Sequence, residues 1–263
     1  MPDGTRPGLT PEDPRALRFP YIMFDLGSTL IYFEGDWRTV MGEALQASTG
    51  YLRSLGYNLD EKVFPRAYFD LIQDFYRRRN DKFIEYTSDQ VLKEALGRSY
   101  PKPPPEHIRQ SLKVMYGVLQ EHWFIEQDAI PTLETLRARG HHLGIVSNAA
   151  DDDDVQTLVD NARLRPYFDF ILTSAVAGVR KPNPKIFEDA LARWGARPDQ
   201  AVMVGDTLTA DIAGANQVGI ASVWVMRRAD TPENRSLAKM YPPGATIYAL
   251  SELPGLLERW PWP

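Results

Sequence analysis

The feature that most constrains this fold is a repeated pattern in which a short apolar run ends in polar residues and a helical stretch follows. The first run, Tyr21–Phe24, leads directly into the polar loop Asp25–Thr29. Similar runs occur at His141–Val146, Phe170–Leu172, Ala201–Val204 and Ile220–Val225. Buried parallel strands are short, nearly continuous apolar runs that alternate with helices. The pattern therefore predicts an α/β protein with a doubly wound parallel sheet.

Helical periodicity accompanies these runs. We expect helices over Ala129–Arg139, Val155–Leu164, Pro184–Trp194 and Leu208–Gln217. A last short strand near Thr246–Tyr248 and a helix over Ser251–Arg259 would complete the sheet domain.

The segment between the first and second strands has helical rather than strand periodicity. Its apolar residues fall into four groups, within Val40–Leu52, Ala67–Tyr76, Val91–Leu96 and Ile108–Trp123. This predicts a small all-helical domain over residues 36–125, inserted into a core domain made of residues 20–35 and 126–263. Residues 1–19 are rich in Pro and Gly and lack apolar periodicity, so we expect a flexible tail there.

Composition excludes several classes of protein. The chain has 30 Lys and Arg against 35 Asp and Glu, a net charge of −5, and its basic residues are scattered. This gives no electrostatic footprint for nucleic acid or for an anionic membrane, and no apolar run is long enough to span a bilayer. Because the chain has no Cys, it has no disulfide and no thiolate nucleophile. We expect a cytoplasmic monomer or homodimer.

Polar residues follow the expected strands where a ligand would bind. In an open parallel sheet, ligands occupy the crevice at the carboxyl ends of the strands. Asp25, Ser147, Lys181, Asp206 and Asp211 all lie at or shortly after such ends. Several carboxylates in one cleft are costly without a ligand, whereas a divalent cation and a phosphate would balance the charges. Mg²⁺ suits this donor set because it prefers oxygen ligands.

Four short segments, in this order, resemble the motifs of the haloacid dehalogenase-like (HAD) superfamily. They are Phe24–Leu30 (FDLGSTL), Ile145–Asn148 (IVSN), Arg180–Phe187 (RKPNPKIF) and Val204–Asp211 (VGDTLTAD). The resemblance implies a Rossmann-like core domain, and the helical insertion resembles the cap of that family's small-molecule phosphatases. It implies a magnesium-dependent hydrolase, most simply a phosphatase acting on a small phosphorylated metabolite.

Residue by residue, the resemblance implies a division of roles. Asp25 would attack phosphorus and form an aspartyl-phosphate. Ser147 would bond a phosphate oxygen, and Lys181 would neutralise the nucleophile and the transferring phosphoryl group. Asn148 and Thr29 are the further candidates for phosphate or substrate binding.

The same resemblance implies a metal site. Asp25, the backbone carbonyl of Gly27 and Asp206 would bind Mg²⁺ directly. Asp211 would act through water or by orienting Asp206. The acidic run Asp151–Asp154 is interpreted instead as favourable charge at a helix N-terminus.

One position departs from the family pattern. Its phosphatases usually carry an Asp two residues after the nucleophile, which protonates the leaving oxygen, and here that position is Gly27. A general acid contributes about 10²- to 10⁴-fold in rate, or roughly 3 to 5 kcal/mol. Glu34, Asp36 or a cap residue would have to replace it. Gly27 is equally compatible with a structural need for positive φ.

Gly27 keeps two alternatives open. The chain could be a catalytically weakened member that binds a phosphorylated ligand or partner. It could be a phosphonate hydrolase, which needs a cap lysine that forms a Schiff base. The candidates for that role are Lys62, Lys82, Lys93, Lys102 and Lys113. The dehalogenase branch also lacks the Asp but needs no metal, so the paired acids Asp206 and Asp211 argue against it.

Overall fold

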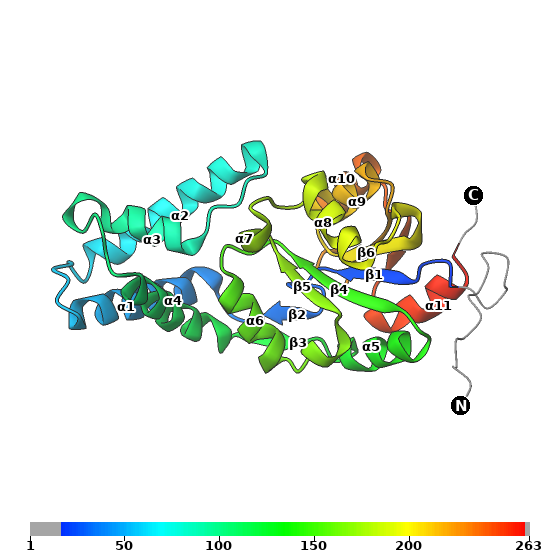
Figure 1. Ribbon diagram of the computed structural model, residues 1–263, viewed down its shortest axis with the longest axis horizontal. Coiled ribbons are helices and arrows are strands. Elements are labelled where there is room, and N and C mark those ends of the chain that lie inside the picture. The colour runs from blue at the N-terminus through cyan, green and yellow to red at the C-terminus, as the bar shows by residue number, and fades with distance from the viewer. Residues whose placement is uncertain (1–16, 261–263) are drawn as a thin grey trace, which may run out of the picture.

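The computed structural model describes residues 17–260, which form a parallel sheet covered by helices on both faces and a helical extension at one end (Figure 1). The sheet has six parallel strands in the order β5-β4-β1-β6-β7-β8. Their bounds are Tyr21–Phe24 (β1), His142–Ser147 (β4), Phe170–Thr173 (β5), Ala201–Gly205 (β6), Ala221–Val225 (β7) and Ala245–Ile247 (β8). The expected α/β, Rossmann-like fold is confirmed.

Strand β1 lies at the centre of the sheet because its side chains are apolar on both faces. Ile22, Met23 and Phe24 are all fully buried. Ile22 and Phe24 pack with α5 (Ala129–Ala138), α6 (Asp152–Asn161) and α11 (Leu253–Glu258). Met23 points to the opposite face and packs with α8 (Pro184–Trp194) and α9 (Ala213–Gln217). This two-sided burial accounts for the continuous apolar run in the sequence.

Four helices occupy the segment between the first two sheet strands and have an apolar core of their own. They are α1 (Trp37–Ser54), α2 (Val63–Lys82), α3 (Ser88–Leu96) and α4 (Pro105–Gln120). Two short antiparallel strands, β2 (Ile31–Phe33) and β3 (Trp123–Ile125), connect them to the sheet. The sequence did not predict this pairing, and it was wrong to place Trp123 in the fourth helix, which ends at Gln120.

The remaining elements are short. They are α7 (Ser174–Ala177), α10 (Pro232–Met240), a π-helical turn η4 (Leu208–Ile212) and the 3₁₀ turns η1 (Gly97–Ser99), η2 (Arg165–Tyr167), η3 (Pro198–Gln200) and η5 (Leu250–Glu252). Neither α7 nor α10 was expected. Within residues 17–260, no helix is both long and apolar enough to cross a membrane.

The N-terminal boundary of the ordered core needs a correction. The predicted tail falls largely on residues 1–16, outside the described residues, but it also included Phe19. Phe19 is buried, its ring lies edge-on to Trp260 at 5.0 Å, and its carbonyl oxygen lies 2.8 Å from His141 Nδ1. The tail prediction is therefore wrong at Phe19, whose contacts come from residues distant in sequence.

Candidate active site

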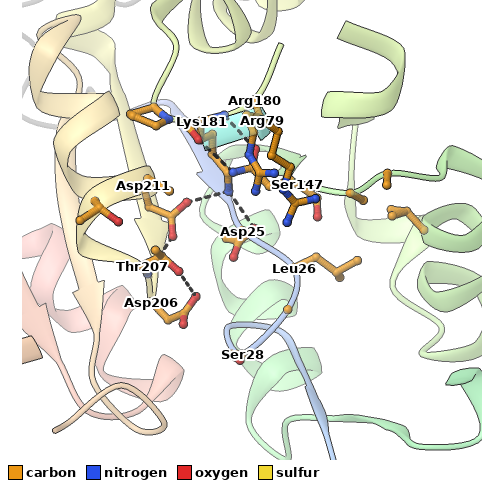
Figure 2. Close-up of a pocket in the computed structure, with 18 of the residues that line it drawn as sticks. Asp25, Leu26, Ser28, Arg79, Ser147, Arg180, Lys181, Asp206, Thr207 and Asp211 are labelled. Atoms are coloured by element: carbon orange, nitrogen blue, oxygen red, sulfur yellow. Dashed lines mark hydrogen bonds and ion pairs between the residues drawn. The ribbon is translucent and has the colours of Figure 1, made fainter. Parts of the chain in front are cut away.

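The sheet register brings the motif residues together at the carboxyl edge. Phe24 pairs with Ile145 on one side and with Val204 on the other. Asp25, the next residue, therefore lies between the ends of β4 and β6, where Ser147 and Asp206 are located. All three line one cavity of about 810 Å³, together with Lys181 and Asp211 (Figure 2).

Lys181 is the buried charge at the centre of this group. Its Nζ lies 2.8 Å from Asp25 Oδ1, 2.6 Å from Asp211 Oδ1 and 2.7 Å from the carbonyl oxygen of Val146. Burial alone would lower the pKa of Lys181, but the charges of Asp211 and Asp25 and the hydrogen bonds to them outweigh it and raise the pKa. Lys181 therefore stays an ammonium ion beside the Asp25 carboxylate.

The side chain of Asn148 holds the Lys181 loop in place. Its Oδ1 accepts a hydrogen bond from Lys181 N at 2.8 Å, and its Nδ2 donates to Lys181 O at 3.0 Å. Asn148 therefore positions the Lys181 backbone, and it also lines the cavity. Its role in phosphate binding stays a prediction.

Thr29 does not belong to the cavity. Its side chain is buried, it is absent from the cavity lining, and its hydroxyl makes no hydrogen bond to the described residues. Ser28 lines the cavity instead, with a positive φ of 58°. The proposed role of Thr29 in phosphate binding therefore finds no support in this geometry.

Three carboxylates are arranged as ligands for one cation. Asp25, Asp206 and Asp211 each offer an oxygen, and these oxygens all lie within 4.8 Å of one another. Burial and the charge of Asp25 raise the pKa of Asp211 to about 6, against the opposing effect of Lys181. Burial and the charges of Asp25 and Asp211 likewise raise the pKa of Asp206 well above its usual value. A divalent cation would relieve this repulsion, so the donor set fits Mg²⁺.

Asp211 owes its place to close packing. It lies in the π-helical turn η4, and its Oδ2 accepts a hydrogen bond from Thr207 N at 2.9 Å. A Cβ added at Gly205 would lie 2.3 Å from that same oxygen. Glycine at the end of β6 therefore gives the carboxylate room to reach the cavity.

Gly27 lines the cavity, but not with positive φ, which corrects one of the two explanations offered for it. A Cβ at this position would lie 3.4 Å from Cη2 of Trp123, the first residue of β3. The indole therefore lies beside the position from which an acidic side chain would extend.

The cavity lining also contains groups that the sequence analysis did not assign to the site. They are Trp37 from α1, Tyr76 and Arg79 from α2, Tyr116 from α4, and Arg180 from the Lys181 loop. Their contribution depends on how the inserted helices pack over the sheet, and no local pattern indicates it. The only sequence signal was for Arg180, which precedes Lys181 in a motif.

Two residues of the acidic run also line the cavity. Asp151 is the N-cap of α6 and accepts a hydrogen bond from Asp154 N at 3.0 Å, which confirms the run as helix N-terminal charge. Asp154 accepts a bond from Gln120 Nε2 at 2.8 Å, and burial raises its pKa to about 7. By contrast, the expected proton donors Glu34 and Asp36 do not line the cavity, and Asp36 is the exposed N-cap of α1.

Comparison with known proteins gives a consistent pattern. A family model described as haloacid dehalogenase-like hydrolase matches residues 20–219. Ribulose-1,5-bisphosphate 5-phosphatase of Halopiger xanaduensis is 30% identical over 202 residues, 77% of this chain and 82% of that protein. Glyceraldehyde 3-phosphate phosphatase of Methanopyrus kandleri is 32% identical over 157 residues, 59% of this chain and 67% of that protein.

Solved structures share the fold over most of the chain. The HAD phosphatase of Thermococcus onnurineus is 25% identical with a TM-score of 0.61, covering 90% of this chain and 97% of that one. The 2-haloacid dehalogenase of Pseudomonas syringae is 26% identical with a TM-score of 0.63, covering 92% and 100%. These likenesses extend over the sheet and the inserted helices together.

Proposed function

The chain belongs to the haloacid dehalogenase-like hydrolases, and from that membership we propose that it is a magnesium-dependent phosphatase. Its substrate is a small phosphorylated metabolite, and its nucleophile is Asp25. The observation that carries the proposal is the Lys181 ammonium, which lies between Asp25 and Asp211 while Asp206 completes a three-carboxylate donor set. The named phosphatases among its relatives support the same reaction.

In the proposed reaction, a carboxylate oxygen of Asp25 attacks phosphorus, and the ester oxygen leaves with the bonding electron pair. Water then attacks the phosphorus of the aspartyl-phosphate, which releases phosphate and restores Asp25. Lys181 and the Ser147 hydroxyl bind the non-bridging oxygens, where the charge of the transferring group lies. Asn148 keeps the Lys181 backbone in register with the strand ends.

Asp25, Asp206, Asp211 and the Gly27 carbonyl would hold the Mg²⁺. When bound, the ion supplies positive charge that offsets the carboxylates and the phosphoryl oxygens. The dehalogenase reaction, which one structural neighbour's name suggests, has no use for this donor set.

The geometry of the cavity argues against one alternative, the phosphonate hydrolase, and leaves the other, the binding protein, open. All five lysines considered for a Schiff base are exposed, and none lines the cavity, so the phosphonate hydrolase has no candidate lysine there. The catalytically weakened binding protein keeps one supporting observation, the absence of an acid at Gly27.

The test is a screen of several dozen phosphorylated metabolites with Mg²⁺ and with EDTA. We expect phosphate release from a subset, lost with EDTA and in Asp25→Asn. The matched control is Asp36→Asn, because Asp36 is an exposed helix cap outside the cavity and Asn caps equally well. Failure to release phosphate from any ester would favour the binding protein, and an active Asp25→Asn enzyme would contradict the nucleophile.

A further inference from the structure

Two arginines lie on the cavity wall beside the proposed phosphate site, and the proposed reaction does not use them. Arg79 comes from the inserted helix α2, and Arg180 directly precedes Lys181. Figure 2 shows both side chains on the same side of the cavity as Ser147 and Lys181. They bring two permanent positive charges to one place from opposite parts of the molecule.

A single buried carboxylate, that of Glu85, pairs with both arginines. Its Oε1 lies 3.4 Å from Arg79 Nη1, and its Oε2 lies 3.7 Å from Arg180 Nη1. Oε2 also accepts a hydrogen bond from Ser174 Oγ at 2.6 Å, and the carboxylate does not face the cavity. The single negative charge of Glu85 offsets only one of the two positive charges. The two arginines therefore keep a net positive charge beside the cavity.

The donors of these arginines outnumber the acceptors that the protein offers. Each guanidinium carries five N–H groups in a rigid fork. Arg79 Nε and Arg180 Nη1 are buried without a hydrogen-bond partner among the described residues. Burial and the charge of Arg79 also lower the pKa of Arg180, as expected for a crowded pair of cations. An additional anion would relieve both deficits.

We propose that Arg79 and Arg180 form a second anion site, so that the substrate carries a second anionic group besides the phosphate that is hydrolysed. The inference rests on the proposed phosphatase function and specifies its substrate class. A carboxylate and a phosphate share the required chemistry, because both accept paired hydrogen bonds from guanidinium groups.

The acidic residues of the cavity do not cancel this site. Asp151 and Asp154 line the same cavity, and burial raises the pKa of both. Both groups are therefore protonated more readily than ordinary aspartates, which weakens their repulsion of an anion.

The second anion site joins the inserted helices to the sheet domain. Two backbone hydrogen bonds already join the parts here: Glu85 N donates to Gly178 O at 3.1 Å, and Arg180 N donates to Phe83 O at 2.9 Å. An anion held by both arginines would bridge the two parts directly. The site is thus complete only while the inserted helices contact the sheet domain, and a substrate with two anionic groups favours that contact.

The test compares phosphate esters that differ in one anionic group. One pair is 3-phosphoglycerate and glycerol 3-phosphate, which exchange a carboxylate for a hydroxymethyl group. The other pair is ribulose 1,5-bisphosphate and ribulose 5-phosphate, which tests a phosphate. We expect kcat/KM to be about 10-fold or more higher for the member with the second anion in at least one pair, because only that member accepts charge-assisted hydrogen bonds from the two arginines.

In Arg79→Gln, that preference should fall to about 2-fold or less. The matched control is Arg77→Gln, two residues earlier on α2, whose side chain is 73% exposed and pairs with Asp74. If Arg79→Gln does not fold because Glu85 loses a partner, Arg79→Gln/Glu85→Gln removes both charges together. Calorimetric binding of both esters of a pair to Asp25→Asn, with and without Arg79→Gln, measures the same preference without turnover.

The outcomes separate the two proposals. Equal kcat/KM within both pairs, or a preference that survives Arg79→Gln, overturns the second anion site and leaves the phosphatase proposal standing. Failure to hydrolyse any ester, together with preferential binding that Arg79→Gln abolishes, overturns the phosphatase proposal and retains the anion site.

Discussion

At the scale of single residues, the site depends on side chains whose partners are supplied from several strands. Lys181 is only 2% exposed and would lose its proton readily if it stood alone. Asp25, Asp211 and the Val146 carbonyl surround its ammonium group, and the Asn148 amide holds its backbone. The ammonium is thus fixed before substrate arrives, which is what electrostatic catalysis requires.

Gly27 predicts selectivity by leaving group. A general acid helps most when the leaving oxygen is strongly basic, so aryl and acyl phosphates should be hydrolysed faster than alkyl phosphates. Gly27→Asp should raise alkyl phosphate turnover by about 10-fold or more, and aryl turnover less. Steady-state kinetics on matched alkyl and aryl esters measures this.

Gly27→Ala is the control, because it adds the Cβ that meets Trp123 at 3.4 Å without adding an acid. The melting temperatures of both variants separate a packing effect from a chemical one. Equal rates for alkyl and aryl esters in the unmodified enzyme, with chemistry rate-limiting, would show that another residue donates the proton.

Asp154 predicts a pH-dependent stability. Its pKa is about 7 in the folded protein and near 3.8 without burial, so folding favours the protonated form. The stability this provides is complete below about pH 4 and is lost as pH rises through 7. Because Asp154 is half-buried, solvent screens its charge, and we expect an effect of about 1–2 kcal/mol.

Asp154→Asn keeps an acceptor for Gln120 but cannot ionise. Its melting temperature should therefore be a few degrees higher than that of the unmodified protein at pH 8, and about the same at pH 4. Thermal melts from pH 4 to pH 8 measure the difference. Asp153→Asn, an exposed change in the same turn of α6, is the control. A stability gain for Asp154→Asn that did not vary with pH would refute this account.

At the scale of elements, the inserted helices meet the sheet domain at two places. One is the β2–β3 pair, in which Phe33 lies opposite Trp123. The other is the short backbone pairing of Ile84 with Val179, flanked by the bonds of Glu85 and Arg180. Motion of the helices about the first contact would have to break the second, so this second contact is the one that opening of the cavity must disrupt.

Glu85→Gln should weaken that second contact. It removes the charge that faces two arginines, which should cost about 1–3 kcal/mol and speed amide exchange at residues 83–85 and 178–180. Hydrogen exchange by mass spectrometry measures this, and fluoroaluminate, a mimic of the transferring phosphoryl group, should slow exchange there in the unmodified protein. Glu94→Gln, an exposed change on α3, is the control. Unchanged exchange in Glu85→Gln would show that the backbone bonds alone hold the contact.

At the scale of the whole molecule, the proposed metal site couples ion binding to folding. Its carboxylates come from β1 and from the region after β6, which meet only in the folded sheet. A ligand that binds only the folded state stabilises it by about 2.7 kcal/mol at 100 times Kd. Mg²⁺ should therefore raise the melting temperature by several degrees, as measured by calorimetry.

Asp206→Asn should lose most of that stabilisation, because it removes one of the three carboxylates. Asp199→Asn, an exposed change in the turn before β6, should retain it. If Mg²⁺ stabilised Asp206→Asn as much as the unmodified protein, the assignment of Asp206 to the metal would be refuted.

The sequence by itself determined the sheet and the residues at its carboxyl edge. Apolar runs such as Tyr21–Phe24 indicate strands, because a strand that is buried on both faces has apolar residues at consecutive positions. Three motif residues stand at the end of such a run or directly after it, so their position at the edge follows from the strand. Asp25, Ser147 and Asp206 could be placed for this reason.

Only the tertiary structure decided what surrounds those residues. Trp123 lies beside Gly27, and Arg79 shares Glu85 with Arg180, across about one hundred residues of chain in each case. The spacing of apolar residues indicates burial only within one helix or strand, whereas these contacts depend on how the inserted helices pack over the sheet. The same limit explains why Thr29 was assigned to the site: its local sequence matches a motif, but its side chain is buried in the folded protein.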